Sequence, residues 1–359
     1  MLDVRCSTFI SFLFDQTGRF SGQQRCSYET TLNLKENCFI LECIRPASYT
    51  LEPLPFTLYH GAYMNLQFEP ISLGKQEDYL NMLTRYPQVA SDYSFMNLWG
   101  WAEEYGLNWA WNDDCVWIRQ SRPEVLYWAP VGPWYDIDWS ARLVAKPDES
   151  TIFIRIPDKL VEHWQTIFKD QATFAEERGH WDYVYSVSDL IDLKGNRFHK
   201  KKNLLNQFVK KYEFTYVPFK PELIGQAMAM QQNWCTWRDC ESSDVLSAEN
   251  RAVFRVLENW EQLGGTMGGA IFVDGSMVAY TVAEALTPQS VVIHFEKGDT
   301  RFKGVYQAIN QMFLAHCPRD FATVNREQDL NDEGLRKSKL SYNPSEFLRK
   351  FRVTFAGSI

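Results

Sequence analysis

Two segments of the chain combine cations with local structure suited to anion binding. The first, residues 194–211, carries seven Lys or Arg and no acidic residue. Asn196 predicts a helix start, because Asn is a favoured N-cap. The first turn or so of this helix then holds Arg197, Lys200, Lys201 and Lys202. Cations there oppose the helix dipole at a cost of about 0.3–1 kcal/mol each, while exposed amides beside lysines attract phosphate or carboxylate. We expect this segment to bind a phosphate-bearing cofactor, a lipid head group or an RNA backbone; the alternative is a solvated basic face.

The second segment follows a predicted strand at residues 291–297. A short loop holds Arg301 and Lys303, and Gly304 opens a predicted helix that ends near His316. Backbone amides at a helix start, flanked by two cations, suit a pyrophosphate. The loop therefore predicts a second anion-binding feature, although a strand–Gly–helix junction is common.

Ionisable side chains on this strand and the preceding one could perform acid–base chemistry. His294 and Glu296 share one face of the strand, because side chains alternate, and Glu284 lies on the strand before it. Acyl transfer requires that the acceptor lose a proton and that donors stabilise an oxyanion. We predict Glu284 or Glu296 as general base, with His294 as a further catalytic candidate. The alternative is that the carboxylates form cross-strand ion pairs and that His294 is a packed histidine.

Aromatic residues gather around a second candidate surface. On a helix over residues 234–241, Trp237 and Arg238 share a side with Trp234 and could wall an acceptor pocket. Ordinary packing of the tryptophans is the alternative, and it is our interpretation of those at 99, 101, 109 and 111.

The elements that position these residues repeat along the chain. A helix at residues 95–105, a hairpin at 108–119 and strands at 125–129 and 151–156 form the first set. The second set has a hairpin around Asp274-Gly275, the strand at 291–297, the helix opened by Gly304 and a strand at 321–326. This order predicts an α/β fold with mixed sheets, built from two divergent copies of one unit. We expect domains at 64–193 and 216–359, joined by a basic connecting helix at 194–215.

Composition sets further limits. The chain has 359 residues and a net charge of −8, so a polyanion must bind through a local basic patch. No apolar run is long enough to span a membrane, and we expect a cytoplasmic protein without a metal site. Because that compartment is reducing, we predict that the eight cysteines are free thiols. Residues 1–63 contain no Trp and no sustained period, so we interpret them as an extension outside the core, either an upstream misread start or an N-terminal arm.

Two resemblances follow from these residues. The stretch Arg301-Phe302-Lys303-Gly304-Val305 resembles the R/Q-x-x-G-x-G/A acyl-CoA loop of GNAT acyltransferases, with Tyr306 in place of the final Gly/Ala. A closer resemblance covers about residues 70–353. It rests on the stretches 90–95, 178–183, 195–205 and 325–329, which are similar to the C-terminal catalytic part of phosphatidylglycerol lysyltransferase, without its membrane portion.

The closer resemblance implies two tandem GNAT-like acyltransferase domains, related to Fem-type aminoacyl transferases. It also implies transfer of an acyl or aminoacyl group from acyl-CoA or aminoacyl-tRNA to a small-molecule, peptide or lipid head-group acceptor, with tRNA as a partner. Tyr342 resembles in position the tyrosine that protonates the leaving group in some GNAT enzymes. The other class of function left open is a catalytically inactive module of this fold that binds an anionic ligand or RNA.

Overall fold

The structure, a computed structural model, describes residues 66–112, 114–143 and 151–355. The extension predicted at residues 1–63 lies outside these residues.

The first sheet has seven strands and contains both ends of the described chain. In spatial order its strands are β1 (Glu69–Pro70), β2 (Asn108–Trp111), β3 (Val116–Gln120), β4 (Leu126–Trp128), β5 (Thr151–Pro157), β14 (Lys350–Phe355) and β6 (Ala172–Glu176). β4 and β5 run parallel, and the other neighbours run antiparallel. A parallel pair requires a crossover connection, and α3 (Trp139–Arg142) lies within it.

The second sheet repeats this plan. Its spatial order is β8 (Phe214–Pro218), β9 (Thr266–Val273), β10 (Ser276–Thr287), β11 (Ser290–Gly298), β12 (Thr323–Asn325), β7 (Asp182–Ser186) and β13 (Glu346–Leu348). β11 and β12 form the parallel pair, and α9 (Val305–Ala315) supplies the crossover. The predicted α/β class with mixed sheets is confirmed, as are the turn at Asp274-Gly275, where both φ angles are positive, and the helix at 95–105.

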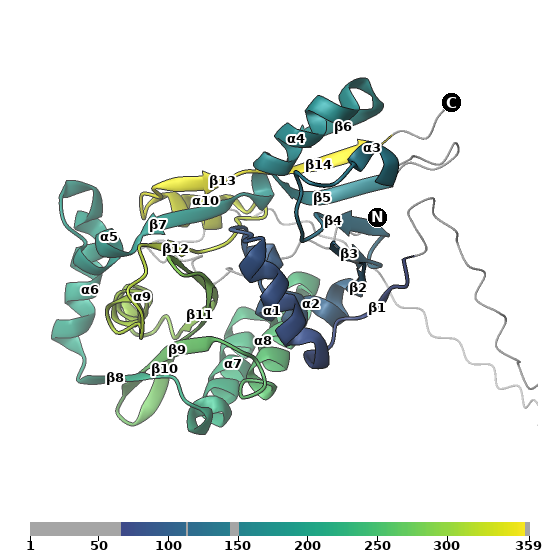
Figure 1. Ribbon diagram of the computed structural model, residues 1–359. Helices are drawn as coiled ribbons and strands as arrows, with labels where there is room; N and C mark the ends of the chain where they lie inside the picture. The colour runs from purple at the N-terminus through teal and green to yellow at the C-terminus, as the bar shows by residue number, and fades with distance from the viewer. Residues whose placement is uncertain (1–65, 113, 144–150, 356–359) are drawn as a thin grey trace, which may run out of the picture. The chain divides into compact units, whose positions relative to one another are not determined.

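The sixth strand of each sheet comes from the other half of the chain. β14 lies between β5 and β6 in the first sheet, and β7 takes the corresponding place between β12 and β13 in the second (Figure 1). The sheets therefore do not follow the predicted boundaries of 64–193 and 216–359. Because of this exchange, the backbone N–H and C=O groups of β7 and β14 find hydrogen-bond partners in a neighbouring strand on each side, and both neighbours belong to the other half of the chain.

Helices cover the sheets and enclose two main cores. They are α1 (Gln76–Arg85), α2 (Phe95–Tyr105), α4 (Asp158–Phe168), α5 (Val187–Asp192), α6 (His199–Lys211), α7 (Ile224–Arg238), α8 (Asp244–Glu258) and α10 (Glu333–Leu340). α2 shows why such segments form: the Ser94 side chain accepts from Asn97 N at its start, and Gly106 ends it with φ 58°. Trp101 and Trp109 are buried as predicted, whereas Trp99 and Trp111 are partly buried. Among the described residues, no helix has both the length and the apolar character needed to cross a bilayer.

The exchanged strand offers a test of this fold. Val353 is fully buried at the centre of β14, while its neighbour Thr354 is only half-buried. We expect Val353→Ala to lower the free energy of unfolding by about 2–3 kcal/mol, because it leaves a cavity in the core that packs against the first sheet. Thr354→Ala, the matched control, should cost less than about 1 kcal/mol. Urea unfolding followed by tryptophan fluorescence measures both, and equal losses would contradict a buried central position for β14.

Candidate functional site

The predicted anion loop packs directly on the basic helix. Gly304 has φ 89°, and a Cβ atom at this position would lie 2.2 Å from the carbonyl oxygen of Leu204 in α6. Only glycine combines that backbone conformation with such close contact. The Tyr212 hydroxyl, just beyond α6, accepts from Lys303 N at 3.3 Å and donates to Arg301 O at 3.4 Å. The two basic segments therefore adjoin one another.

We name this feature the basic surface; it consists of Lys200, Lys201, Lys202, Arg301 and Lys303. Lys200 and Lys202 are exposed, and the Arg301 side chain is 72% exposed although it pairs with Asp299. The loop with Arg301 and Lys303 contacts α6 at Leu204, just after the three lysines, and contacts Tyr212 beyond its end. Cations gathered along this helix in an acidic protein suit an anion.

Arg197, the remaining predicted cation, forms an ion pair at the surface. Its guanidinium contacts the Asp189 carboxylate at 2.7 Å, and both side chains remain largely exposed. An exposed pair of this kind contributes little stability, so Arg197 can still take part in anion binding.

The predicted substrate-binding residues lie at the end of α7. Trp237 is 46% exposed, and the Arg301 guanidinium lies 4.7 Å from its ring centroid. Arg238 lies 5.8 Å from the ring of the buried Trp234. Trp237 thus adjoins the basic surface, whereas Trp234 is packed.

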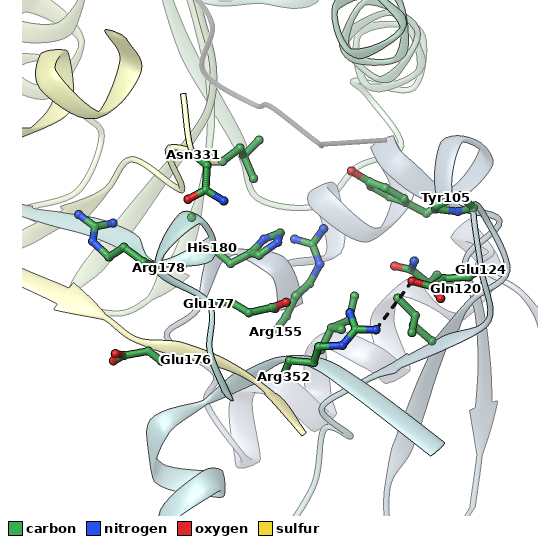
Figure 2. A pocket seen from close by; sticks show the side chains of 15 residues that line it. Tyr105, Gln120, Glu124, Arg155, Glu176, Glu177, Arg178, His180, Asn331 and Arg352 are labelled. Atoms are coloured by element: carbon green, nitrogen blue, oxygen red, sulfur yellow. Dashed lines mark ion pairs between the residues drawn. The ribbon is translucent and has the colours of Figure 1, made fainter. Parts of the chain in front are cut away.

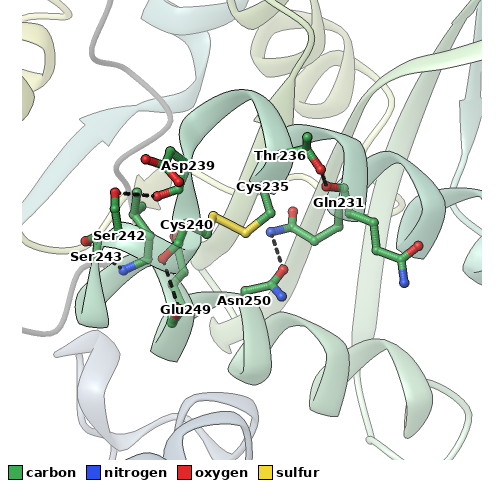
Figure 3. Close-up of a disulfide and its surroundings, with 12 residues drawn as sticks. Gln231, Cys235, Thr236, Asp239, Cys240, Ser242, Ser243, Glu249 and Asn250 are labelled. Atoms are coloured by element: carbon green, nitrogen blue, oxygen red, sulfur yellow. Dashed lines mark hydrogen bonds between the residues drawn. A yellow bond between two sulfur atoms is a disulfide. The ribbon is translucent and has the colours of Figure 1, made fainter. Parts of the chain in front are cut away.

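A disulfide closes this end of α7. Cys235 and Cys240 are bonded, with their Cα atoms 5.1 Å apart (Figure 3). The prediction that all eight cysteines are free thiols is therefore wrong for this pair. Our expectation rested on compartment alone, whereas the helix ends at Asp239 in a left-handed conformation that brings the two sulfurs together.

The predicted catalytic groups on β10 and β11 are buried and hydrogen-bonded. His294 lies between two carboxylates, with Nε2 2.9 Å from Glu284 Oε1 and Nδ1 2.7 Å from Glu327 Oε1. Burial lowers the pKa of His294, but the hydrogen bonds to Glu284 and Glu327 outweigh it and raise the pKa to about 9. His294 is therefore an imidazolium at neutral pH that donates from both nitrogens, so it is not poised to accept a proton.

Glu296 occupies a similar setting. It accepts from Asn310 Nδ2 at 3.0 Å and pairs with Arg326 at 3.1 Å, and its side chain is fully buried. Burial raises its pKa despite the nearby Arg326. Glu284 and Glu296 thus match the ion-pair alternative in this structure.

These contacts bridge the place where β11 and β12 part. The register of the two strands ends at Val292 and Asn325. Beyond it, side chains connect the strands through the contacts of His294 with Glu327 and of Glu296 with Arg326.

Tyr342 connects this buried group to the basic surface. Lys201 Nζ lies 4.1 Å from the centroid of its ring and the Arg326 guanidinium 4.8 Å. The hydroxyl accepts from Gln307 Nε2 at 2.9 Å. Burial raises the pKa of Tyr342 to about 12, so its phenol keeps its proton at neutral pH.

The structure also reveals a buried charge cluster that we did not predict, formed by Asp92, Asp182, Arg155 and Lys350. Asp92 pairs with Arg155 and Lys350, and Lys350 Nζ lies 2.6 Å from Asp182. Gln328 donates to Asp182 at 2.9 Å. Burial raises the pKa of Asp92, but Lys350 and Arg155 outweigh it and lower the pKa to about 2.

Three of the stretches that carried the family resemblance meet at the buried charge cluster. Asp92 belongs to residues 90–95, Asp182 to residues 178–183 and Gln328 to residues 325–329. The resemblance was the only signal for these residues, because nothing in their spacing predicts that they meet. Strained backbone accompanies them, since Glu327, Leu330 and Asn331 all have φ between 51° and 64°.

Residues 83–354 match the family described as phosphatidylglycerol lysyltransferase, C-terminal. The chain belongs to this family. It is also similar to a conserved protein of unknown function from Bacteroides thetaiotaomicron, at 29% identity and TM-score 0.73, over 81% of this chain and 100% of that one.

Two more distant structures share the fold. One is L-PGS from Bacillus licheniformis, at 11% identity and TM-score 0.51, over 79% of this chain and 92% of that one. The other is FemX, at 7% identity and TM-score 0.53, over 82% and 98%. Both structures share the predicted α/β fold with mixed sheets. Membership of this family supports a role like that of an aminoacyl or acyl transferase.

The imidazolium at His294 has a measurable consequence. Its pKa is raised to about 9 in the folded protein, from about 6.5 in an unfolded chain. The resulting stabilisation is complete below pH 6.5 and is lost as the pH rises through 9. We expect the wild-type protein to lose about 1–3 kcal/mol of its free energy of unfolding over this pH range, and His294→Gln not to show this loss.

The measurement compares urea unfolding of wild type and variant at pH 6.5, 7.5 and 9. Lys339 has its pKa lowered to about 7 by burial, so it acts in the opposite direction, but it is common to both proteins and cancels in their difference. Parallel curves for the two proteins would show that His294 is neutral.

Proposed function

We propose that this protein transfers an activated acyl or aminoacyl group from an anionic carrier, aminoacyl-tRNA or acyl-CoA, to an amine or hydroxyl. The observation that carries the proposal is the contact between Gly304 and α6, which joins two groups of cations into the basic surface. An anionic carrier needs such a site in a chain whose net charge is −8. Either carrier would place the reaction in the cytoplasm.

The chemistry is an acyl transfer. The acceptor nitrogen or oxygen attacks the carrier's carbonyl carbon, and the bond to the carrier's oxygen or sulfur breaks. The leaving atom takes a proton from a side chain, and the proton lost by the acceptor restores that side chain directly or through water. Tyr342 is the group we propose to protonate the leaving atom, because its phenol is neutral and lies beside Lys201 of the basic surface. We assign Glu284, His294 and Glu296 to positioning, since each is held in a buried ion pair: Glu284 with His294, and Glu296 with Arg326.

The two carriers make different demands on the loop. Tyr306 stands where a GNAT loop has a small residue; it is buried, and it receives a hydrogen bond from Trp234 Nε1 at 3.3 Å. A bulky residue there disfavours the usual coenzyme A contact, whereas the lysines of α6 suit an RNA backbone. Aminoacyl-tRNA is therefore the carrier we favour.

The burial of all three base candidates favours one other function. A module of this fold that binds an anionic ligand or RNA without catalysis would keep the basic surface and needs no accessible base. It predicts carrier binding without product.

The test begins with binding. We expect Lys200→Gln/Lys202→Gln to weaken binding of charged tRNA about tenfold at 150 mM salt, and to reduce the salt slope by about 2, because each lysine neutralises about one phosphate. Lys159→Gln/Lys169→Gln, on and just beyond α4, removes two exposed lysines away from the basic surface and is the matched control. Fluorescence anisotropy with charged tRNA, uncharged tRNA and acyl-CoA as separate ligands measures the effect. Equal affinity in the two variants would exclude the basic surface as the carrier site.

Transfer is then measured with the carrier that binds. Incubating the protein with a radiolabelled aminoacyl or acyl carrier and a mixture of soluble amines should move label into an amine fraction. We expect Tyr342→Phe to lower this rate at least tenfold with unchanged carrier affinity, because it removes a proton donor and retains the ring. Binding without any transfer would support the non-catalytic module.

A further inference from the structure

A pocket of about 530 Å³ lies over the first sheet and includes none of the residues of the basic surface. Most of its lining residues are polar or charged (Figure 2): Tyr105, Gln120, Glu124, Arg155, Glu176, Glu177, Arg178, His180, Asn331 and Arg352. The others are Pro123, Leu126, Ile154, Gly179 and Leu330. Such a lining suits a small polar ligand and not a lipid chain.

The floor of the pocket presents a buried cation. Tyr105, Gln120 and Arg155 are each at most 4% exposed. The Arg155 guanidinium pairs with Asp92, and its Nε atom is buried without a hydrogen-bond acceptor in the described part of the chain. Arg155 also has φ 58° in the middle of β5, a conformation that a non-glycine residue adopts at some energetic cost. The guanidinium, paired with Asp92 at one nitrogen, keeps its Nε–H as a donor for an anionic group of a ligand.

The rim carries both signs of charge. Glu124, Glu176 and Asn331 are exposed, and Arg352 is half-buried. Arg352 and Glu124 are separated by 3.8 Å, which is too long for a hydrogen bond. Carboxylates at the rim can therefore receive a ligand amine while the floor holds its anionic group.

Two of the lining residues come from the segment that follows β12 of the second sheet. Leu330 and Asn331, which line the pocket, follow the end of β12, and Arg301 follows the end of β11. β11 and β12 are parallel neighbours, so their carboxyl ends point to the same edge. Ligands of α/β proteins bind at this kind of edge.

We propose that the pocket is the acceptor site, and that the acceptor is a small water-soluble molecule carrying an amine and an anionic group. The assignment as acceptor rests on the proposed function; the binding of such a molecule does not. The anionic group binds at Arg155 and the amine lies toward Glu124 and Glu176.

The test uses three probes of similar length: 6-aminohexanoate, hexanoate and hexylamine. The last two each lack one of the charged groups. Isothermal titration calorimetry with the full chain should show binding of 6-aminohexanoate at least fivefold tighter than either of the others. Phosphoethanolamine, in a parallel titration, distinguishes a phosphate from a carboxylate as the preferred anion.

Variants locate the binding. We expect Arg352→Gln and Glu176→Gln each to weaken 6-aminohexanoate about three- to tenfold. The matched control is Arg349→Gln: its pair with Asp158 spans 3.7 Å, similar to that of Arg352 with Glu124, and it does not line the pocket. Arg155→Lys keeps a cation beside Asp92 and should weaken binding at least tenfold. If this variant does not fold, the two rim variants are sufficient for the test.

Each result decides the proposal. Selective binding of probes with both groups, lost in the rim variants and kept in Arg349→Gln, supports it. Equal binding of the three hexyl probes, no binding at 10 mM, or an equal loss in Arg349→Gln overturns it. Failure here leaves carrier binding by the basic surface intact, and failure of carrier binding leaves these titrations unchanged, so the two proposals fail separately.

Discussion

The buried charge cluster is the constraint on which the rest of the structure depends. Two carboxylates, Asp92 and Asp182, share the cations Arg155 and Lys350 away from solvent. Lys350 begins β14, and Asp182 begins β7, so the cluster lies where the two exchanged strands start. Removing one member of such a group leaves an unpaired buried charge, which costs about 3–5 kcal/mol. The cluster thereby ties the strand exchange to the pocket that Arg155 lines.

Local sequence patterns were sufficient to predict those helices and turns whose periodicity or turn residues lie within the element itself. The helix at 95–105 was placed correctly because its apolar residues recur every three or four positions. In the structure Gly106 ends it. The turn at Asp274-Gly275 follows from the positive φ that both residues tolerate. The order of elements also predicted the repeated unit, since crossover helices and parallel strands occur together in each half.

What the sequence could not predict depends on distant partners. β7 and β14 each pair with strands from the other half, and no local period indicates which edge a strand will join. Alternation placed Glu296 on the same face as His294, but nothing nearby shows that Arg326 would neutralise it. The pocket was missed for the same reason, because its lining comes from six separate parts of the chain and contains none of the predicted site residues.

Amide hydrogen exchange tests the central claim, that one carrier covers both basic segments. The full chain is compared alone, with charged tRNA and with acyl-CoA. We expect one carrier to protect residues 199–211 and 299–306 together, because Gly304 packs on α6, and protection to fall in parallel as salt rises. Protection of only one of these segments, or of neither, would contradict the account.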